Sequence, residues 1–361
     1  MRLIALVATL LLAFAARAQE APVLNIYNWT DYFDDQALAI FTAETGIKVN
    51  YDTYDSNETL DAKLRAGKSG YDLVVPTASP FLANQIPAKL YQPIDRSRIP
   101  NYRSLDRAIM KQLAAYDPGN RHAVPWMWGT TGIAYNVQKI EAAMPNAPVD
   151  SLAMLFDPGI VARFKSCGIV MLDSPTDVLP QALAWLKLNP DSDKPEDLEQ
   201  ATATLLAVRP FIRKFHSSEY VSDLATGDAC LAIGFSGDVA QAAKRARAAK
   251  NGVEIAYRVP KEGAQMWIDT WAIPAGAPHP GNAHRFLDFV LRPEIAGMNS
   301  NFIGYANANA EAEPFVDAEI LKDPGIYPDA ETLARLFTVN PKPQAYERLR
   351  TRAWTRVTSG R

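Results

Sequence analysis

Stretches with a period of two residues alternate with stretches of helical period over the first hundred residues of the chain. Short β-rich or alternating runs predict strands at 23–27, 47–51 and 73–75. Between them, apolar residues at helical spacing, preceded by capping residues and followed by glycines, predict helices at 34–46 and 56–67. This β-α-β-α-β order is typical of a parallel sheet flanked by helices, in which ligands bind beyond the carboxyl ends of the strands.

Two later apolar stretches are candidates for strands that cross between two domains. Residues 125–136 form an aromatic stretch interrupted by glycines, and residues 266–274 could form the return crossing. Further segments are predicted as strands near 168–172 and 229–234 and as helices at 282–291 and 330–336. A second α/β region and a mainly helical last third, in a chain of 361 residues, indicate about two domains.

The N-terminus has the pattern of a secretory signal. Arg2 is basic, residues 3–15 are apolar apart from one threonine, and residues 16–18 have the A-x-A spacing of a cleavage site. A membrane anchor is the alternative, but a spanning helix needs ~20 apolar residues. No later segment is long and apolar enough to span a bilayer. We therefore expect residues 1–18 to be a signal peptide and the mature protein to be exported and soluble.

Charge and composition narrow the classes of ligand. The chain is 48% hydrophobic, which is enough for a sizeable core, and its formal charge is −3. Loss of Arg2 and Arg17 with the signal would make the mature protein more acidic still. A mildly acidic surface argues against a nucleic-acid partner and is compatible with a cationic ligand.

The two cysteines are Cys167 and Cys230. An exported chain meets an oxidising compartment, where an even number of cysteines favours a disulfide. Two buried thiols are the alternative. Neither cysteine belongs to a C-x-x-C motif, so a redox or zinc-binding role is not expected.

Signatures of enzymes are mostly missing from the sequence. Gly67-Lys68-Ser69 looks like the end of a phosphate-binding loop, but the glycine required five residues earlier is Ala62. Residues 234–237 lack the G-x-S-x-G spacing of a nucleophile elbow. The four histidines are scattered, and no pair has the spacing of a zinc-protease motif. We therefore expect no catalytic residue, no cofactor and no metal.

Acidic residues recur close to aromatic residues, at loop positions and on one strand. These groups are Trp29 with Asp31 and Tyr32, Phe235 with Asp238, Trp267 with Asp269 and Trp271, and Tyr305. Such groups suit an alkyl ammonium, because carboxylates pair with the NH3+ ends. Aromatic faces cover the methylenes and attract the charge by ~0.5–2 kcal/mol per contact. Aromatic and acidic residues also bind sugars, so this chemistry leaves both ligand classes open.

Asp269 is the acidic residue for which the sequence supports a ligand contact best. Trp267, Asp269 and Trp271 are two residues apart and share one face of the predicted strand. A buried carboxylate needs a cation or several hydrogen-bond donors, and no helix cap is available here. An internal salt bridge is the alternative explanation.

The other members of these groups also have structural explanations. Asp238 could favour the start of a helix, and Asp177 could belong to a capping box. Asp31 could be a turn residue, and Trp29 and Tyr305 could be core aromatics.

Seven segments of the chain resemble the bacterial periplasmic polyamine receptors, most closely the putrescine-binding type. They are Ile26–Tyr32, Leu73–Pro76, Ser166–Gly168, Phe215–Ser218, Gly237–Asp238, Tyr305–Asn309 and Thr351–Thr355. The resemblance covers essentially all of the mature sequence. It implies a type II periplasmic-binding-protein fold, with two α/β lobes joined by crossing strands and a ligand cleft between them.

The resemblance also implies a set of ligand-binding residues and a disulfide between Cys167 and Cys230. The aromatic box of the family falls on Trp29, Phe235, Trp267 and Tyr305, and its acids fall on Asp31, Asp177, Asp238 and Asp269. Its polar contacts fall on Thr30, Thr77 and Ser79, and we add Tyr32, which follows the first strand.

Several departures bear on the identity of the ligand. Phe235 stands where the family commonly has tryptophan, Asp177 stands where it has glutamate, and Pro80 replaces an aromatic residue of the putrescine type. Trp267 and Thr30 look more like the spermidine type, whereas Asp31, Ser79 and Asp238 look more like the putrescine type. The expected ligand is therefore a polyamine, with putrescine favoured over spermidine.

The resemblance assigns residues 19–128 and 267–308 to the first lobe and residues 129–266 and 309–361 to the second. It implies a monomeric receptor in the periplasm that delivers its ligand to an inner-membrane ABC permease. A receptor for an amino acid or a sugar would share the fold. An exported enzyme is the alternative of another class, and it would need a nucleophile or a metal site.

Overall fold

One mixed sheet runs through the whole molecule. The structure is a computed structural model that describes residues 20–360, so the expected signal peptide at residues 1–18 lies outside the described residues. The strand order is β2-β1-β3-β9-β4-β7-β5-β6, with β8 and β10 pairing with β4 and β11 pairing with β9. The strands are β1 (Val23–Trp29), β2 (Lys48–Tyr54), β3 (Leu73–Val74), β4 (Ala123–Asn136), β5 (Ile169–Met171), β6 (Lys214–Phe215), β7 (Leu231–Phe235), β8 (Ile255–Arg258), β9 (Ala264–Ala272), β10 (Ala306–Asn307) and β11 (Leu336–Phe337).

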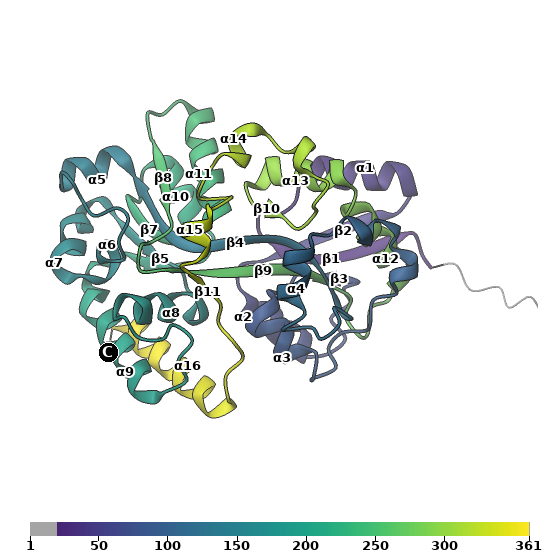
Figure 1. Cartoon of the computed structure of the whole chain (residues 1–361), viewed down its shortest axis with the longest axis horizontal. Helices are drawn as coiled ribbons and strands as arrows, with labels where there is room; N and C mark the ends of the chain where they lie inside the picture. The colour runs from purple at the N-terminus through teal and green to yellow at the C-terminus, as the bar shows by residue number, and fades with distance from the viewer. Residues whose placement is uncertain (1–19, 361) are drawn as a thin grey trace, which may run out of the picture.

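Helices gather around the two ends of this sheet, which gives the molecule two lobes (Figure 1). The helices of the first lobe are α1 (Asp35–Thr45), α2 (Asn57–Arg65), α3 (Ala83–Gln85), α4 (Arg107–Leu113), α12 (Pro280–Val290) and α13 (Pro293–Ile303). The other helices are α5 (Val137–Ala143), α6 (Ala153–Phe156), α7 (Pro158–Val161), α8 (Pro175–Trp185), α9 (Pro195–Val208), α10 (Tyr220–Thr226), α11 (Ser236–Ala249), α14 (Ala318–Leu321), α15 (Ala330–Leu333) and α16 (Gln344–Ser359).

The strands β4 and β9 connect the two lobes (Figure 1). The start of β4 pairs with the end of β9 in the first lobe, and its residues Thr131–Tyr135 pair with β7 in the second lobe. The register between β4 and β9 shifts between Pro125 and Trp128, as at a β-bulge. The two stretches predicted to cross between domains are therefore the connecting strands.

Each lobe has its own hydrophobic core. The first core includes Leu24, Phe41 and Phe286, and the second includes Phe164 and Ile233. The second core lies entirely between residues 133 and 357. The residue boundaries given above for the lobes stay a prediction.

The first hundred residues fold as their pattern predicts. The side chain of Asp34 caps α1, and Gly46 ends it with a φ of 70°, a conformation that favours glycine. The side chain of Ser56 caps α2, and β1 pairs in parallel with both β2 and β3. The β-α-β-α-β prediction is confirmed.

The helix predicted at residues 330–336 is shorter than expected. It ends at Leu333, and Leu336 instead belongs to β11, where it pairs with Ala264 of β9. Pairing with β9 provides hydrogen bonds for the backbone groups of Leu336 and Phe337. These tertiary hydrogen bonds stabilise the strand more than the helix propensity of the segment stabilises a helix.

A disulfide joins Cys167 to Cys230 in the second lobe, with 5.5 Å between the two Cα atoms. The predicted bridge is confirmed. It closes a loop with a sequence separation of 63, and a loop of that size gains ~4 kcal/mol in the chain-entropy model. Every helix within residues 20–360 is too short or too polar to cross a membrane.

Candidate ligand-binding site

A pocket that is partly open to solvent lies between the two lobes. Side chains from both lobes and from the connecting strand β9 line it. The lining residues are Trp29, Thr30, Tyr32, Tyr54, Asp55, Asn57, Thr77, Ser79, Pro80, Phe81, Thr176, Asp177, Ser217, Ser218, Phe235, Asp238, Gln265, Trp267, Asp269 and Tyr305. Among the twelve residues predicted for the site, every one except Asp31 is in this lining.

Asp269 lies on β9 in the wall of the pocket and is only 4% exposed. The hydroxyl of Thr77 donates to its Oδ1 at 2.6 Å, and Asn57 in turn donates to that hydroxyl at 2.8 Å. Burial raises the pKa of Asp269 to about 7. Within the described residues no lysine or arginine forms an ion pair with it, so the internal salt bridge considered above is not found.

Asp238 lies in the first turn of α11 on the second lobe. Tyr305 donates to its Oδ1 at 2.6 Å, and Tyr220 donates to its Oδ2 at 2.8 Å. Burial nevertheless raises its pKa to about 6. A Cβ at position 237 would lie 2.4 Å from the ring of Tyr305, so Gly237 allows the tyrosine to reach the carboxylate.

Asp177 lies in the first turn of α8. Ser174 precedes this helix but makes no side-chain cap to its backbone; its hydroxyl donates to Oδ2 of Asp177 at 2.5 Å. Thr131 of β4 donates to Oδ1 at 3.4 Å. Burial raises the pKa of Asp177 to about 6. The helix start predicted here therefore coexists with a carboxylate that faces the pocket.

These three carboxylates give the pocket its electrostatic character. Neutral hydroxyl groups donate to each of them, and no lysine, arginine or histidine of residues 20–360 lines the pocket. The charges of Asp177 and Asp238 add to the effect of burial in raising the pKa of Asp269. A cation that entered the pocket would lower the cost of ionising all three groups.

The predicted aromatic residues form a continuous row of rings. The ring centroids of Trp29 and Phe235 are 6.5 Å apart, those of Phe235 and Trp267 are 5.7 Å apart, and those of Trp267 and Tyr305 are 5.3 Å apart. All three pairs meet edge to face. Flat apolar surfaces next to carboxylates can cover an alkyl chain while its charged ends are paired.

The remaining polar residues of the prediction also line the pocket. Ser79 donates through its hydroxyl to the carbonyl of Val339 at 2.5 Å, and Thr30 donates to the carbonyl of Tyr54 at 3.3 Å. The hydroxyl of Tyr32 is buried close to the carboxylate of Asp269. Burial, together with the nearby Asp269, raises the pKa of Tyr32 well above its ordinary value.

Asp31 does not line the pocket, contrary to the expectation from the sequence. Its carboxylate forms an ion pair of 2.8 Å with Arg245 of α11, and its charge adds to the effect of burial in raising the pKa of the pocket residue Asp238. Asp31 has a φ of 56°, a left-handed conformation that aspartate tolerates better than most residues. Its neighbours Thr30 and Tyr32 line the pocket, whereas Asp31 itself is not in the lining.

Nine lining residues were not predicted as ligand contacts. They are Tyr54, Asp55, Asn57, Pro80, Phe81, Thr176, Ser217, Ser218 and Gln265. Tyr54 and Asp55 lie at the carboxyl end of β2, so the rule that selected Trp29 could have selected them. Gln265 lies two residues before Trp267 on the same face of β9, so the period of two residues in a strand could have predicted it.

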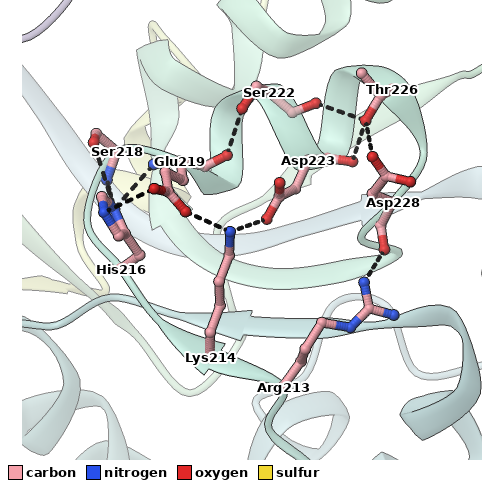
Figure 2. A network of polar contacts seen from close by, with 9 residues as sticks. All are labelled: Arg213, Lys214, His216, Ser218, Glu219, Ser222, Asp223, Thr226 and Asp228. Carbon is pink, nitrogen blue, oxygen red and sulfur yellow. Dashed lines mark hydrogen bonds and ion pairs between the residues drawn. The ribbon is translucent and has the colours of Figure 1, made fainter.

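A polar network surrounds Ser218, one of the two neighbouring serines that line the pocket (Figure 2). Nδ1 of His216 accepts hydrogen bonds from the backbone N–H groups of Ser218 at 3.2 Å and Glu219 at 3.1 Å. Lys214 of β6 pairs with the carboxylate of Glu219 at 2.7 Å. The hydroxyl of Ser217 accepts from the backbone of Asp173 at 3.1 Å. These bonds fix the loop between β6 and α10 at the edge of the pocket.

Comparisons with known proteins agree with this architecture. The sequence matches the family described as bacterial extracellular solute-binding protein over residues 36–328. The putrescine-binding periplasmic protein SpuD of Pseudomonas aeruginosa is 49% identical over 347 residues, covering 96% of this chain and 94% of the relative. The putrescine-binding periplasmic protein PotF of Escherichia coli is 48% identical over 346 residues, covering 95% and 93%.

A solved structure shares the fold. It is described as a putative spermidine/putrescine ABC transporter from Listeria monocytogenes, and it superimposes with a TM-score of 0.85 at 29% identity. The match covers 94% of this chain and 100% of that one. The predicted fold class, two α/β lobes joined by crossing strands, is confirmed.

Proposed function

The chain belongs to the bacterial extracellular solute-binding proteins, and we propose that within this family it is a periplasmic receptor that binds a polyamine. The observation that carries the proposal is a set of three buried carboxylates, Asp177, Asp238 and Asp269, none of which forms an ion pair with a basic side chain of residues 20–360. Buried carboxylates without a counter-ion are costly, and a ligand with two or more ammonium groups removes that cost.

The aromatic row supports an alkyl amine over other cations. Trp267 lies between Asp269 and the acids of the second lobe, so methylene groups between two ammonium groups would pack on its ring. The aromatic faces also attract the positive charge of the ligand. A metal ion has no methylene groups that could pack on these aromatic faces.

Putrescine is the favoured polyamine. The relatives that are 49% and 48% identical are named as putrescine-binding, whereas the Escherichia coli protein named as spermidine/putrescine-binding is 34% identical. Spermidine remains a candidate, because Thr30 and Trp267 match the spermidine type.

The two alternative ligands fit the pocket less well. An amino acid carries a carboxylate, and the described lining offers no basic side chain to pair with it. A neutral sugar would leave the three carboxylates of the pocket without a counter-charge. An enzymatic role would need a nucleophile with its base. Nδ1 of His216 lies 3.5 Å from the hydroxyl of the pocket residue Ser218, but this nitrogen already accepts the backbone N–H groups of Ser218 and Glu219, so it is not available as a base.

The pattern of a secretory signal at residues 1–18 supports export to the periplasm. There the receptor would close its lobes on the ligand and deliver it, as a monomer, to an inner-membrane ABC permease. The role is therefore that of a carrier without catalytic activity.

Calorimetric titration tests the proposal. The mature protein, dialysed free of amines, is titrated with putrescine, spermidine, arginine and glucose. We expect tight binding of putrescine, weaker binding of spermidine and none of arginine or glucose. Saturation at 100 times Kd should also add ~2.7 kcal/mol of stability in a thermal-shift assay. Tight binding of arginine or glucose without binding of either polyamine would overturn the proposal.

A further inference from the structure

Gln265 presents a buried acceptor without a donor at the wall of the pocket. The residue is 3% exposed and lines the pocket, and its Oε1 has no hydrogen-bond partner. Buried polar groups in folded proteins are nearly always paired, and leaving one unpaired costs free energy. Because the side chain of Gln265 lines the pocket, a ligand can supply the missing donor once the amide turns its oxygen toward it.

The strand β9 fixes which end of the ligand Gln265 can reach. Gln265, Trp267 and Asp269 lie on one face of the strand, and four residues of extended chain separate the Cα atoms of Gln265 and Asp269 by ~13 Å. Trp267 lies between them. Gln265 and Asp269 are therefore at opposite ends of the same aromatic surface.

A second contact places Gln265 next to Asp177. Gln265 pairs with Thr131 across the antiparallel strands β9 and β4, so their side chains lie on the same face of the sheet. The hydroxyl of Thr131 donates to Asp177 at 3.4 Å. The helix α8, which carries Asp177, packs against β9.

We propose that Gln265 binds the ligand by accepting a hydrogen bond from the ammonium group that Asp177 holds, and that it helps to select a primary ammonium at this end. An NH3+ group has three donors. Asp177 can accept one or two of them, and the amide oxygen of Gln265 accepts another without adding charge. This inference rests on the proposed polyamine function.

The test compares Gln265→Met with the parent by titration with putrescine. Methionine keeps the length of the side chain and removes the acceptor. We expect about a tenfold loss of affinity, the effect of losing one hydrogen bond to a charged group. Gln265→Glu keeps an acceptor at this position and should bind putrescine at least as tightly as the parent at neutral pH, because a carboxylate also attracts the ammonium group. Gln85→Met is the control, because Gln85 is equally buried but bonded to Tyr91 and Asp61 away from the pocket.

A double-mutant cycle distinguishes contact with the ammonium from a general structural effect. In the background of Asp177→Asn, the Gln265→Met change should cost less than about threefold, because both residues hold the same group. In the background of Asp269→Asn it should keep its full tenfold effect. Equal losses in both backgrounds, or an unchanged affinity of Gln265→Met, would overturn the role of Gln265 and leave the receptor function intact. A parent protein that binds no polyamine would overturn both.

Discussion

The carboxylate of Asp31 lies 2.8 Å from the guanidinium of Arg245, although 214 residues separate them along the chain. Asp31 follows β1 in the first lobe, and Arg245 belongs to α11 in the second. The side chains are 53% and 43% exposed. The ion pair therefore joins the two lobes at the rim of the pocket, and the charge of Asp31 is compensated without a ligand.

The substitution Asp31→Asn should weaken putrescine binding only slightly. An exposed ion pair contributes ~0.2–1 kcal/mol, and salt screens it. We expect Arg245→Gln to produce a loss of the same size, and the double variant to add nothing further, because each change removes the same pair. Titrations at low and high salt measure these effects. A loss as large as that caused by a buried acid would show that Asp31 contacts the ligand directly.

The substitution Asp269→Asn should have a much larger effect. Truncation of one partner of a buried charge pair costs ~2–5 kcal/mol of binding free energy. The variant should stay folded, because asparagine can still accept the hydrogen bond from Thr77 and the packing is unchanged. Titration with putrescine measures the loss. Asp72→Asn is a matched control: Asp72 is fully buried, bonded to His279 and absent from the pocket lining, so its change should leave the affinity as it is.

The sequence predicts best those site residues whose position depends on a single strand. Alternation on one strand predicted that Trp267 and Asp269 share a face, and the rule for the carboxyl ends of parallel strands selected Trp29 and Thr77. Such predictions need only local periodicity, and the structure places all four residues in the pocket.

Partners that are distant in the chain could not be predicted in this way. No local pattern indicates that Arg245 reaches Asp31, or that Tyr305 donates to Asp238. These pairs depend on how the two lobes face each other, and that arrangement follows from the strands β4 and β9. The pairing of Leu336 with β9 could not be predicted for the same reason: it depends on a strand that is distant in the sequence, whereas the local pattern indicated a helix.

His216 should act through the loop that it holds. Its Nδ1 accepts from the backbone N–H groups of Ser218 and Glu219 (Figure 2). Ser218 and the preceding Ser217 line the pocket. His216→Leu removes both bonds and should lower the free energy of unfolding by ~1–2 kcal/mol. It should also weaken putrescine binding, because the loop loses its fixed position. In His216→Asn the amide oxygen can replace Nδ1, so this variant should lose less of both. Denaturant unfolding and titration measure the effects; equal losses in the two variants would contradict this role of Nδ1.

The buried acids also make the stability of the ligand-free protein depend on pH. Burial raises the pKa of Asp269 to about 7 and the pKa values of Asp177 and Asp238 to about 6, whereas an unfolded aspartate has a pKa of ~3.9. Between these limits the folded state binds more protons than the unfolded state. The contribution of these groups to stability is therefore full below ~pH 4 and is lost as the pH rises through 6 and 7.

Binding should show the opposite dependence on pH, because a polyamine pairs with ionised carboxylates. The affinity for putrescine should be highest above pH 7 and should fall by at least ~100-fold between pH 8 and pH 5, since Asp269 alone must release a proton over two units. Titrations at several pH values, in buffers that report proton release, measure this pH dependence.

Asp269→Asn should abolish the step near pH 7. Asp72→Asn, the buried control used above, lies outside the pocket lining and should keep the step. An affinity that stays constant from pH 8 to pH 5 would mean that the three acids are not ionised by the ligand, and the charge pairing proposed for the pocket would be wrong.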